Sequence, residues 1–253
     1  MQNETSTNQI EPRIWNTWST VGLSIVIFII FSTIQVITHL IVAILNISPQ
    51  PEAGIQDLLE SLSTNGLAIS ISTIVAAPVG ILMTFLFIRM RRGLSVPEYL
   101  GLKSFSKKTL PLLLLIPVAL TTVVELIGIF TTEPEDAGFM LEAYKNSVVP
   151  ALFWISVIIF APAFEEVLFR GFIFKGLVRS RIGSAGTIFL TALVWSLFHF
   201  QYNLSGVALV FIIGLILGIV RIKTGSLWGP IIIHSVWNLL QMVMLVLYLN
   251  FPQ

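Results

Sequence analysis

Apolar stretches of roughly 20 residues recur along this chain of 253 residues, and short polar segments separate them. A helix of about 20 apolar residues crosses the hydrocarbon core of a lipid bilayer. The composition agrees, because 55% of the residues are hydrophobic and 11% are charged, whereas soluble domains have about 25% charged residues. The sequence therefore predicts an all-α fold, a polytopic transmembrane helical bundle surrounded by lipid bilayer.

Seven candidate spans share this apolar character, and the pattern also allows six or eight. They cover residues 20–46, 66–88, 109–130, 149–171, 185–200, 205–220 and 227–249. The fifth and sixth are short, so they are either two tilted spans or a partly re-entrant pair. We divide the chain into a polar N-terminal tail (1–19), N-terminal transmembrane helices (20–147) and a C-terminal transmembrane core (148–249).

Lysine and arginine gather in alternate loops, at 89–108, 175–181 and 221–223, whereas acidic residues dominate the loops at 52–60 and 133–142. Because positively charged loops stay in the cytoplasm, we expect a multi-pass protein of the cell membrane with a cytoplasmic N-terminus. The polar first 14 residues do not resemble a cleavable signal. No nucleic-acid partner is expected, and the sequence leaves the oligomeric state open.

Two adjacent carboxylates, Glu165 and Glu166, interrupt the fourth span. An ionisable side chain at mid-bilayer costs roughly 2.5–3.5 kcal/mol by insertion scales, so it needs a partner or a function. Glu166 and Arg170 are one helical turn apart and are expected to form a structural ion pair. Glu165 points about 100° away from Glu166 around the helix, so it is the candidate working carboxylate.

Further polar residues occur in the fifth and seventh spans. The fifth span ends with Trp195 and His199, and the seventh carries His234 and Asn238, again one turn apart. Buried polar groups are costly unless they satisfy one another, so we expect these residues and Glu165 to share one polar site. Cysteine is absent, which excludes disulfides, thiolate catalysis and cysteine-ligated metals.

Two other ionisable residues lie in the apolar spans. His39, in the first span, has no polar companion nearby in the sequence and is expected to be a packing residue. Glu125, in the third span, allows both structural pairing and a role along a substrate path.

Three ordered motifs resemble a known family. They are Glu165-Glu166-x-x-x-Arg170, an aromatic-x-x-x-His motif from Trp195 to His199, and His234-x-x-x-Asn238. This order resembles the type II CAAX prenyl endopeptidases and their prokaryotic relatives, the CAAX protease and bacteriocin-processing (abortive-infection) family of intramembrane proteases. The resemblance covers roughly residues 148–245. It departs at Trp195, where the family usually has Phe, although an aromatic wall is kept.

The resemblance implies an intramembrane endopeptidase whose catalytic core is the segment 148–249. It implies that Glu165 and His199 activate a water molecule, while His234 and Asn238 stabilise the oxyanion. This fits the chemistry of the residues, because a carboxylate is a suitable base and amide or imidazole N–H groups are suitable donors. The substrate would be a membrane-embedded or lipidated peptide, cut near its C-terminus or at its leader.

The use of a metal stays open. Glu165, His199 and His234 would also make a set of three ligands for a divalent metal such as Zn, with water in the fourth position. The family is described both as metalloproteases and as glutamate-dependent hydrolases. No H-E-x-x-H motif is present, so the ligands would come from three helices, and the metal-free interpretation is slightly favoured.

Two other functions compete with a protease. Intramembrane Glu and His also occur in transporters and proton relays, although nearly all ionisable residues of the spans lie in the second half of this chain. A catalytically inert immunity or scaffold protein of the same fold is the other alternative.

The depth of the site gives a structural prediction. Glu165 lies near the end of the predicted fourth span, whereas His199 lies deep in the fifth. The two can meet only if the fourth span continues past Gly171 as a long tilted helix or the fifth span starts deeper. We expect the long tilted helix, with a cavity that opens toward the cytoplasm.

Overall fold

The computed structural model describes residues 14–46, 54–91, 93–128 and 138–251. Within these residues the secondary structure is helical, without strands. Residues 1–13 of the predicted tail lie outside the described residues, as do the acidic loop residues Glu52, Glu133, Glu135 and Asp136.

Six helical segments in the described part of the chain are long and apolar enough to cross a membrane. They are α1 (Thr17–Asn46), α3 (Gly66–Met90), α5 (Leu110–Gly128), the composite helix Pro150–Leu177, α11 (Leu204–Thr224) and α12 (Trp228–Asn250). A shorter apolar helix, α10 (Gly183–Leu197), accompanies them. The polytopic all-α bundle predicted from the apolar stretches is confirmed.

Short helices occupy segments for which the sequence predicted only loops. They are α2 (Ile55–Ser63), α4 (Val96–Leu100), the 3₁₀ turn η1 (Lys107–Thr109) and α6 (Gly138–Lys145). A capping box starts α4, since Ser95 accepts from the backbone N–H of Glu98 and the Glu98 carboxylate accepts from that of Ser95. Such reciprocal bonds satisfy two donors at a helix start.

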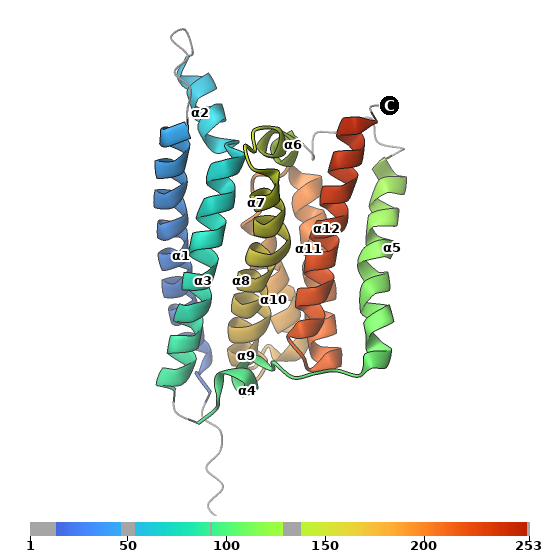
Figure 1. Ribbon diagram of the computed structural model, residues 1–253. Helices are drawn as coiled ribbons and strands as arrows, with labels where there is room; N and C mark the ends of the chain where they lie inside the picture. Colours follow the sequence, from blue (N-terminus) through green and yellow to red (C-terminus); the bar gives the residue numbers. More distant parts are fainter. Residues whose placement is uncertain (1–13, 47–53, 92, 129–137, 252–253) are drawn as a thin grey trace, which may run out of the picture.

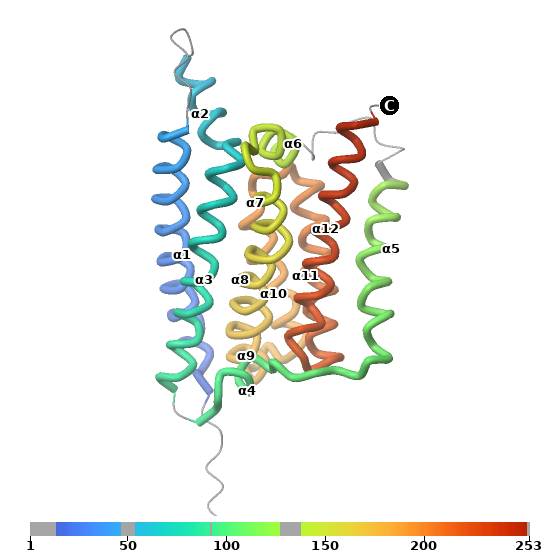
Figure 2. The backbone as a smooth tube through the Cα atoms, viewed as in Figure 1, coloured from blue at the N-terminus to red at the C-terminus, as the bar shows by residue number. Residues whose placement is uncertain are grey.

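The composite helix lies in the middle of the bundle (Figure 1). It has α1 and α3 on one side, and α12 and α5 on the other, while α10 and α11 lie behind it in this view. Figure 2 shows that the chain passes from end to end, so that α4, α9 and the turn between α11 and α12 share one end, and the C-terminus lies at the other. The three Lys/Arg-rich segments therefore lie at the same end, as the predicted topology requires.

The composite helix is assembled from five pieces. They are α7 (Pro150–Ile155), the π-helical η3 (Ser156–Phe160), α8 (Ala161–Glu166), the π-helical η4 (Val167–Ile173) and α9 (Phe174–Leu177). Helix α8 has a proline in its first turn, and a proline that lacks an N–H disturbs the bonding of the preceding turn. Single π-helical turns often occur at functional sites. The prediction that this helix runs past Gly171 is confirmed, because it ends at Leu177.

Some predicted boundaries were wrong. Helix α11 has 21 residues and reaches Thr224, so the sixth span is not short, and Arg221 belongs to its last turn rather than to the following loop. Helix α10 has 15 residues, or about 22 Å at 1.5 Å per residue, which is shorter than a bilayer core of about 30 Å. It ends at Leu197, so His199 lies in the turn that follows.

Close packing of α1 and α3 supports the middle of the composite helix. Phe164, the residue before Glu165, is buried, and its ring stacks on Phe31 with centroids 4.0 Å apart. On the other side, a Cβ at Gly80 of α3 would lie 2.3 Å from the Phe164 ring, so only glycine allows this approach. The carboxylates of α8 are thus attached to a tightly packed part of the bundle.

Candidate active site

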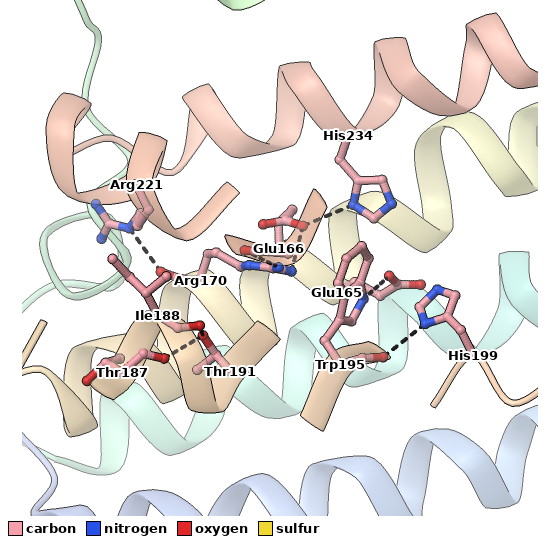
Figure 3. A network of polar contacts seen from close by, with 11 residues as sticks. Glu165, Glu166, Arg170, Thr187, Ile188, Thr191, Trp195, His199, Arg221 and His234 are labelled. Atoms are coloured by element: carbon pink, nitrogen blue, oxygen red, sulfur yellow. Dashed lines mark hydrogen bonds and ion pairs between the residues drawn. The ribbon is translucent and has the colours of Figure 1, made fainter. Parts of the chain in front are cut away.

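Glu165 and Trp195 meet between the composite helix and α10. The indole Nε1–H of Trp195 donates to Oε2 of Glu165 over 2.6 Å (Figure 3). Glu165 is half-buried, whereas Trp195 is 3% exposed. Both residues are 12 positions from the helix end nearest the basic segments, or about 18 Å by the helical rise. Their similar depth results from the extension of the composite helix to Leu177.

His199 is held by the same tryptophan. Its Nδ1 lies 2.9 Å from the backbone carbonyl oxygen of Trp195, and the two rings meet edge to face with centroids 4.9 Å apart. Since a carbonyl oxygen only accepts, Nδ1 carries the proton, and Nε2 of the neutral ring has its lone pair available. His199 is therefore oriented as a base or acceptor.

Glu166 is the centre of a second, more deeply buried cluster. Its Oε1 accepts from Nη1 of Arg170 over 3.0 Å and from Nδ1 of His234 over 2.9 Å. Glu166 and Arg170 are fully buried, and His234 is 4% exposed. Arg170 also donates through Nη2 to the carbonyl oxygen of Gly214 on α11 over 3.2 Å. The i,i+4 ion pair is thus present, and it also connects α8 and η4 to α11 and α12.

Trp195 lies between the two clusters (Figure 3). The Arg170 guanidinium carbon is 4.5 Å from the centroid of the indole ring, a cation–π distance. The His234 ring lies edge to face with the same indole at 5.2 Å. A Cβ at Gly214 would lie 3.1 Å from the indole, so the glycine lets α11 pack closely beside it. Trp195 is therefore more than the aromatic wall expected from the sequence.

Asn238 contacts the backbone of the composite helix. Its Nδ2 donates to the carbonyl oxygen of Val157 over 2.8 Å. Within the π-helical η3, the N–H of Ala161 bonds to the carbonyl of Ser156, and Pro162 has no N–H. The Val157 carbonyl therefore lacks a partner in its own helix, and Asn238 supplies one. Only one of the two amide hydrogens of Asn238 is used in this bond.

The predicted site residues thus fall into three groups. Glu165 and His199 meet through Trp195, while Glu166, Arg170 and His234 form the buried cluster. Asn238 contacts Val157 instead of either group. The cavities found at the end that carries the basic segments are not lined by Glu165, so the cavity predicted there stays a prediction.

The two isolated ionisable residues lie away from these groups. Nε2 of His39 lies 2.9 Å from the carbonyl oxygen of Leu62, a contact that joins α1 to α2. Glu125 is half-buried, three residues before the end of α5. Among the described residues it has no hydrogen bond or ion pair.

The residues present do not fit a three-ligand metal site. Within the described segments, no three His, Asp or Glu side chains come together as a group able to hold a metal ion. In the set considered from the sequence, Glu165 bonds to the Trp195 indole, and Nδ1 of His234 faces Glu166 rather than Glu165. No step below is therefore assigned to a metal.

The segment that carries both clusters is similar to known proteins. Residues 147–240 match the family model described as Rce1-like, type II CAAX prenyl endopeptidase Rce1-like. A protein of Escherichia coli described as an uncharacterized 24.3 kDa protein is 38% identical over 103 residues. That match covers 38% of this chain and 46% of the relative, which is less than half of either. No solved structure matches the chain.

The chain is thus a multi-pass helical membrane protein, and part of it is similar to the CAAX type of intramembrane protease. More narrowly, residues 147–240, less than half of the chain, match the family model of the Rce1-like type II CAAX prenyl endopeptidases, and the resemblance based on three motifs is confirmed. The matched segment includes both clusters and Asn238.

Sequence reasoning missed two features of this region. One is the indole donor to Glu165, for which the replacement of the usual Phe by Trp195 was an available signal. The other is the buried position of Arg221, whose Nε donates to the Arg170 carbonyl oxygen over 2.9 Å. Because Arg221 lies near the end of an apolar stretch, we predicted that it belongs to a positively charged loop.

Proposed function

We propose that this protein is an intramembrane endopeptidase that hydrolyses a peptide bond near the C-terminus or the leader of a membrane-associated peptide or protein. One observation carries the proposal: Trp195 holds Glu165 through its indole and His199 through its carbonyl. A carboxylate and an imidazole are thereby held by the same residue without bonding to each other, and we propose that a water molecule binds between them.

In the proposed reaction, Glu165 takes the proton of the attacking water. Its Oε2 is occupied by the indole, so Oε1 is the oxygen that accepts the proton. The lone pair on Nε2 of His199 accepts a hydrogen bond from the same water and orients it toward the scissile carbonyl. A positioned general base of this kind typically contributes 10²–10⁴-fold to the rate.

His234 and Asn238 are proposed to stabilise the developing oxyanion. The second amide hydrogen of Asn238 is not used in the bond to Val157, so it is a suitable donor. His234 uses Nδ1 toward Glu166, and its Nε2 donates when the ring carries both protons. Each lost oxyanion donor typically costs 10²–10³-fold in kcat.

The orientation and substrate belong to the same proposal. All three Lys/Arg-rich segments lie at one end of the bundle, which supports a cell-membrane protein with that end and the N-terminus in the cytoplasm. Substrates of the proposed enzyme are membrane-embedded or lipidated peptides, including prenylated C-terminal peptides, bacteriocin leaders, signalling-peptide precursors and membrane-protein tails.

The test compares Glu165→Gln with the wild type. Membranes from cells that make each form are searched for peptide fragments that depend on the intact carboxylate. The matched control is Glu125→Gln, another half-buried glutamate within a span but outside both clusters. We expect Glu165→Gln to abolish a set of fragments that Glu125→Gln retains. Identical fragments from wild type and Glu165→Gln would overturn the assignment.

A further inference from the structure

A basic pocket lies away from the candidate active site, at the end of the bundle that carries α4 and α9. Its volume is about 420 Å³, and its lining includes Glu98, Gly101, Lys103, Lys175, Arg221 and Gly225. This volume is within the usual range of roughly 300–1,000 Å³ for small-molecule sites. We call it the basic pocket.

Positive charge dominates the basic pocket. Lys103, Lys175 and Arg221 contribute three cations, and Glu98 contributes one carboxylate. That carboxylate is already used by the N–H and hydroxyl of Ser95. In the described part of the chain, none of the three cations has a salt bridge, and Lys175 is close enough to Lys103 and Arg221 for mutual repulsion. An anion bound among them would relieve this repulsion.

Arg221 forms a rigid wall of the basic pocket. It is 9% exposed, and it donates through Nε to the Arg170 carbonyl and through Nη2 to the Leu100 carbonyl, each over 2.9 Å. Its Nη1 has no hydrogen bond among the described residues and is available to a ligand. Gly101, with φ of +70°, makes this approach possible, because a Cβ there would lie 2.6 Å from Nη2.

The segment that carries Lys103 is fixed to the turn between α11 and α12. The hydroxyl of Ser226 donates to the Lys103 carbonyl over 2.5 Å, and the N–H of Leu227 donates to the Gly101 carbonyl over 2.9 Å. The ammonium of Lys103 lies beside Gly225, 3.0 Å from where a Cβ would be. The backbone positions of the cations are therefore set before any ligand binds.

We propose that the basic pocket binds a phosphate-bearing anion, with Lys103, Lys175 and Nη1 of Arg221 as its donors. Two sources share this chemistry, the headgroup of an anionic phospholipid and free phosphate. The position at the ends of α9 and α11 favours the headgroup, because basic pockets between transmembrane helices on the cytoplasmic side bind anionic lipid headgroups. The binding needs no protease substrate, so its test is independent of the proposed function.

The experiment uses the full chain purified in neutral detergent. Short-chain phosphatidylglycerol and phosphatidylcholine are titrated and counted by native mass spectrometry, and inorganic phosphate is titrated by calorimetry. The test variant is Lys103→Gln with Lys175→Gln, which leaves the buried Arg221 intact. The matched control is Lys107→Gln with Lys108→Gln, which removes two lysines on the same end of the bundle but outside the basic pocket. Thermal unfolding of each form checks folding.

We expect phosphatidylglycerol to bind the wild type and the control in preference to phosphatidylcholine, and to bind the test variant roughly 30-fold more weakly. A second outcome would also support the anion site: inorganic phosphate binds the wild type but binds the Lys103→Gln, Lys175→Gln variant more weakly, and the two lipids bind equally. That outcome would assign free phosphate as the ligand. Equal loss in test and control variants, or no binding of either anion by the folded wild type, would overturn the proposal.

Discussion

Trp195 donates its indole N–H to Oε2 of Glu165 over 2.6 Å, across 30 positions of sequence. This bond fixes one oxygen of the proposed base and leaves the other free, while the carbonyl of the same residue orients His199. Phe, the residue usual at this position in the resembled family, would keep the packing but has no donor. The contribution of the bond can therefore be measured by restoring Phe.

The substitution Trp195→Phe is expected to lower kcat about 10- to 100-fold with little change in KM. The physical reason is the loss of a hydrogen bond to a charged group, which contributes about 1.5–3 kcal/mol, at a residue that orients the base without touching substrate. Steady-state kinetics on a peptide found with the Glu165→Gln comparison would measure both constants.

The matched control for that variant is Trp228→Phe, at an exposed tryptophan at the start of α12. It should keep wild-type kcat. An unchanged kcat in a folded Trp195→Phe protein would refute the positioning role of Trp195. It would not affect the assignment of Glu165 as the base, which the Glu165→Gln comparison tests separately.

The ion pair of Glu166 and Arg170 gives a prediction about stability. Glu166→Gln or Arg170→Ala should reduce the free energy of unfolding by about 3–5 kcal/mol, because each leaves a buried charge without its partner. The double substitution Glu166→Leu with Arg170→Met should cost less than either single change, since neither charge remains. Thermal or denaturant unfolding in detergent would measure these effects.

An exposed pair provides the comparison for the buried one. Glu142 and Lys145 are also one turn apart, with side chains 44% and 45% exposed. Glu142→Gln should therefore change stability by less than about 1 kcal/mol. A similar small effect for Glu166→Gln would show that the buried network is not a stabilising element.

Local patterns allowed much of this fold to be predicted. Six of the seven apolar stretches correspond to helices long and apolar enough to cross a membrane, because length and composition decide whether a helix can span a bilayer. The pair Glu166 and Arg170 could be predicted from i,i+4 spacing alone. The extension past Gly171 followed from the need to bring Glu165 and His199 to one depth.

Contacts between helices could not be predicted in the same way. In a membrane both faces of a helix are apolar, so periodicity does not fix how a helix is rotated. The sequence therefore did not show that His234 faces Glu166 and that Asn238 faces Val157. The π-helical η3 directly precedes α8 and its Pro162. The buried place of Arg221 depends on the carbonyls of Leu100 and Arg170, which sequence spacing does not reveal.

The contact between Asn238 and Val157 leads to a test that separates structure from catalysis. Asn238→Ala should lower the free energy of unfolding by about 1–3 kcal/mol, since the Val157 carbonyl loses its donor, and should also lower kcat. Adding Pro162→Ala supplies a backbone N–H to the preceding turn. The double variant should regain stability but not cleavage, as measured by unfolding and kinetics. Recovery of both would assign Asn238 to structure alone.

Metal dependence can be tested on the same purified protein. Within the described residues, Glu165, His199 and His234 are not brought together as a group able to hold one metal ion. We therefore expect cleavage to survive dialysis against a strong chelator, with less than about twofold loss of kcat. Elemental analysis should give the same zinc content for wild type, Glu165→Gln and His199→Ala. One equivalent of zinc in the wild type that disappears in both variants, together with activity restored by added zinc, would instead establish these residues as ligands.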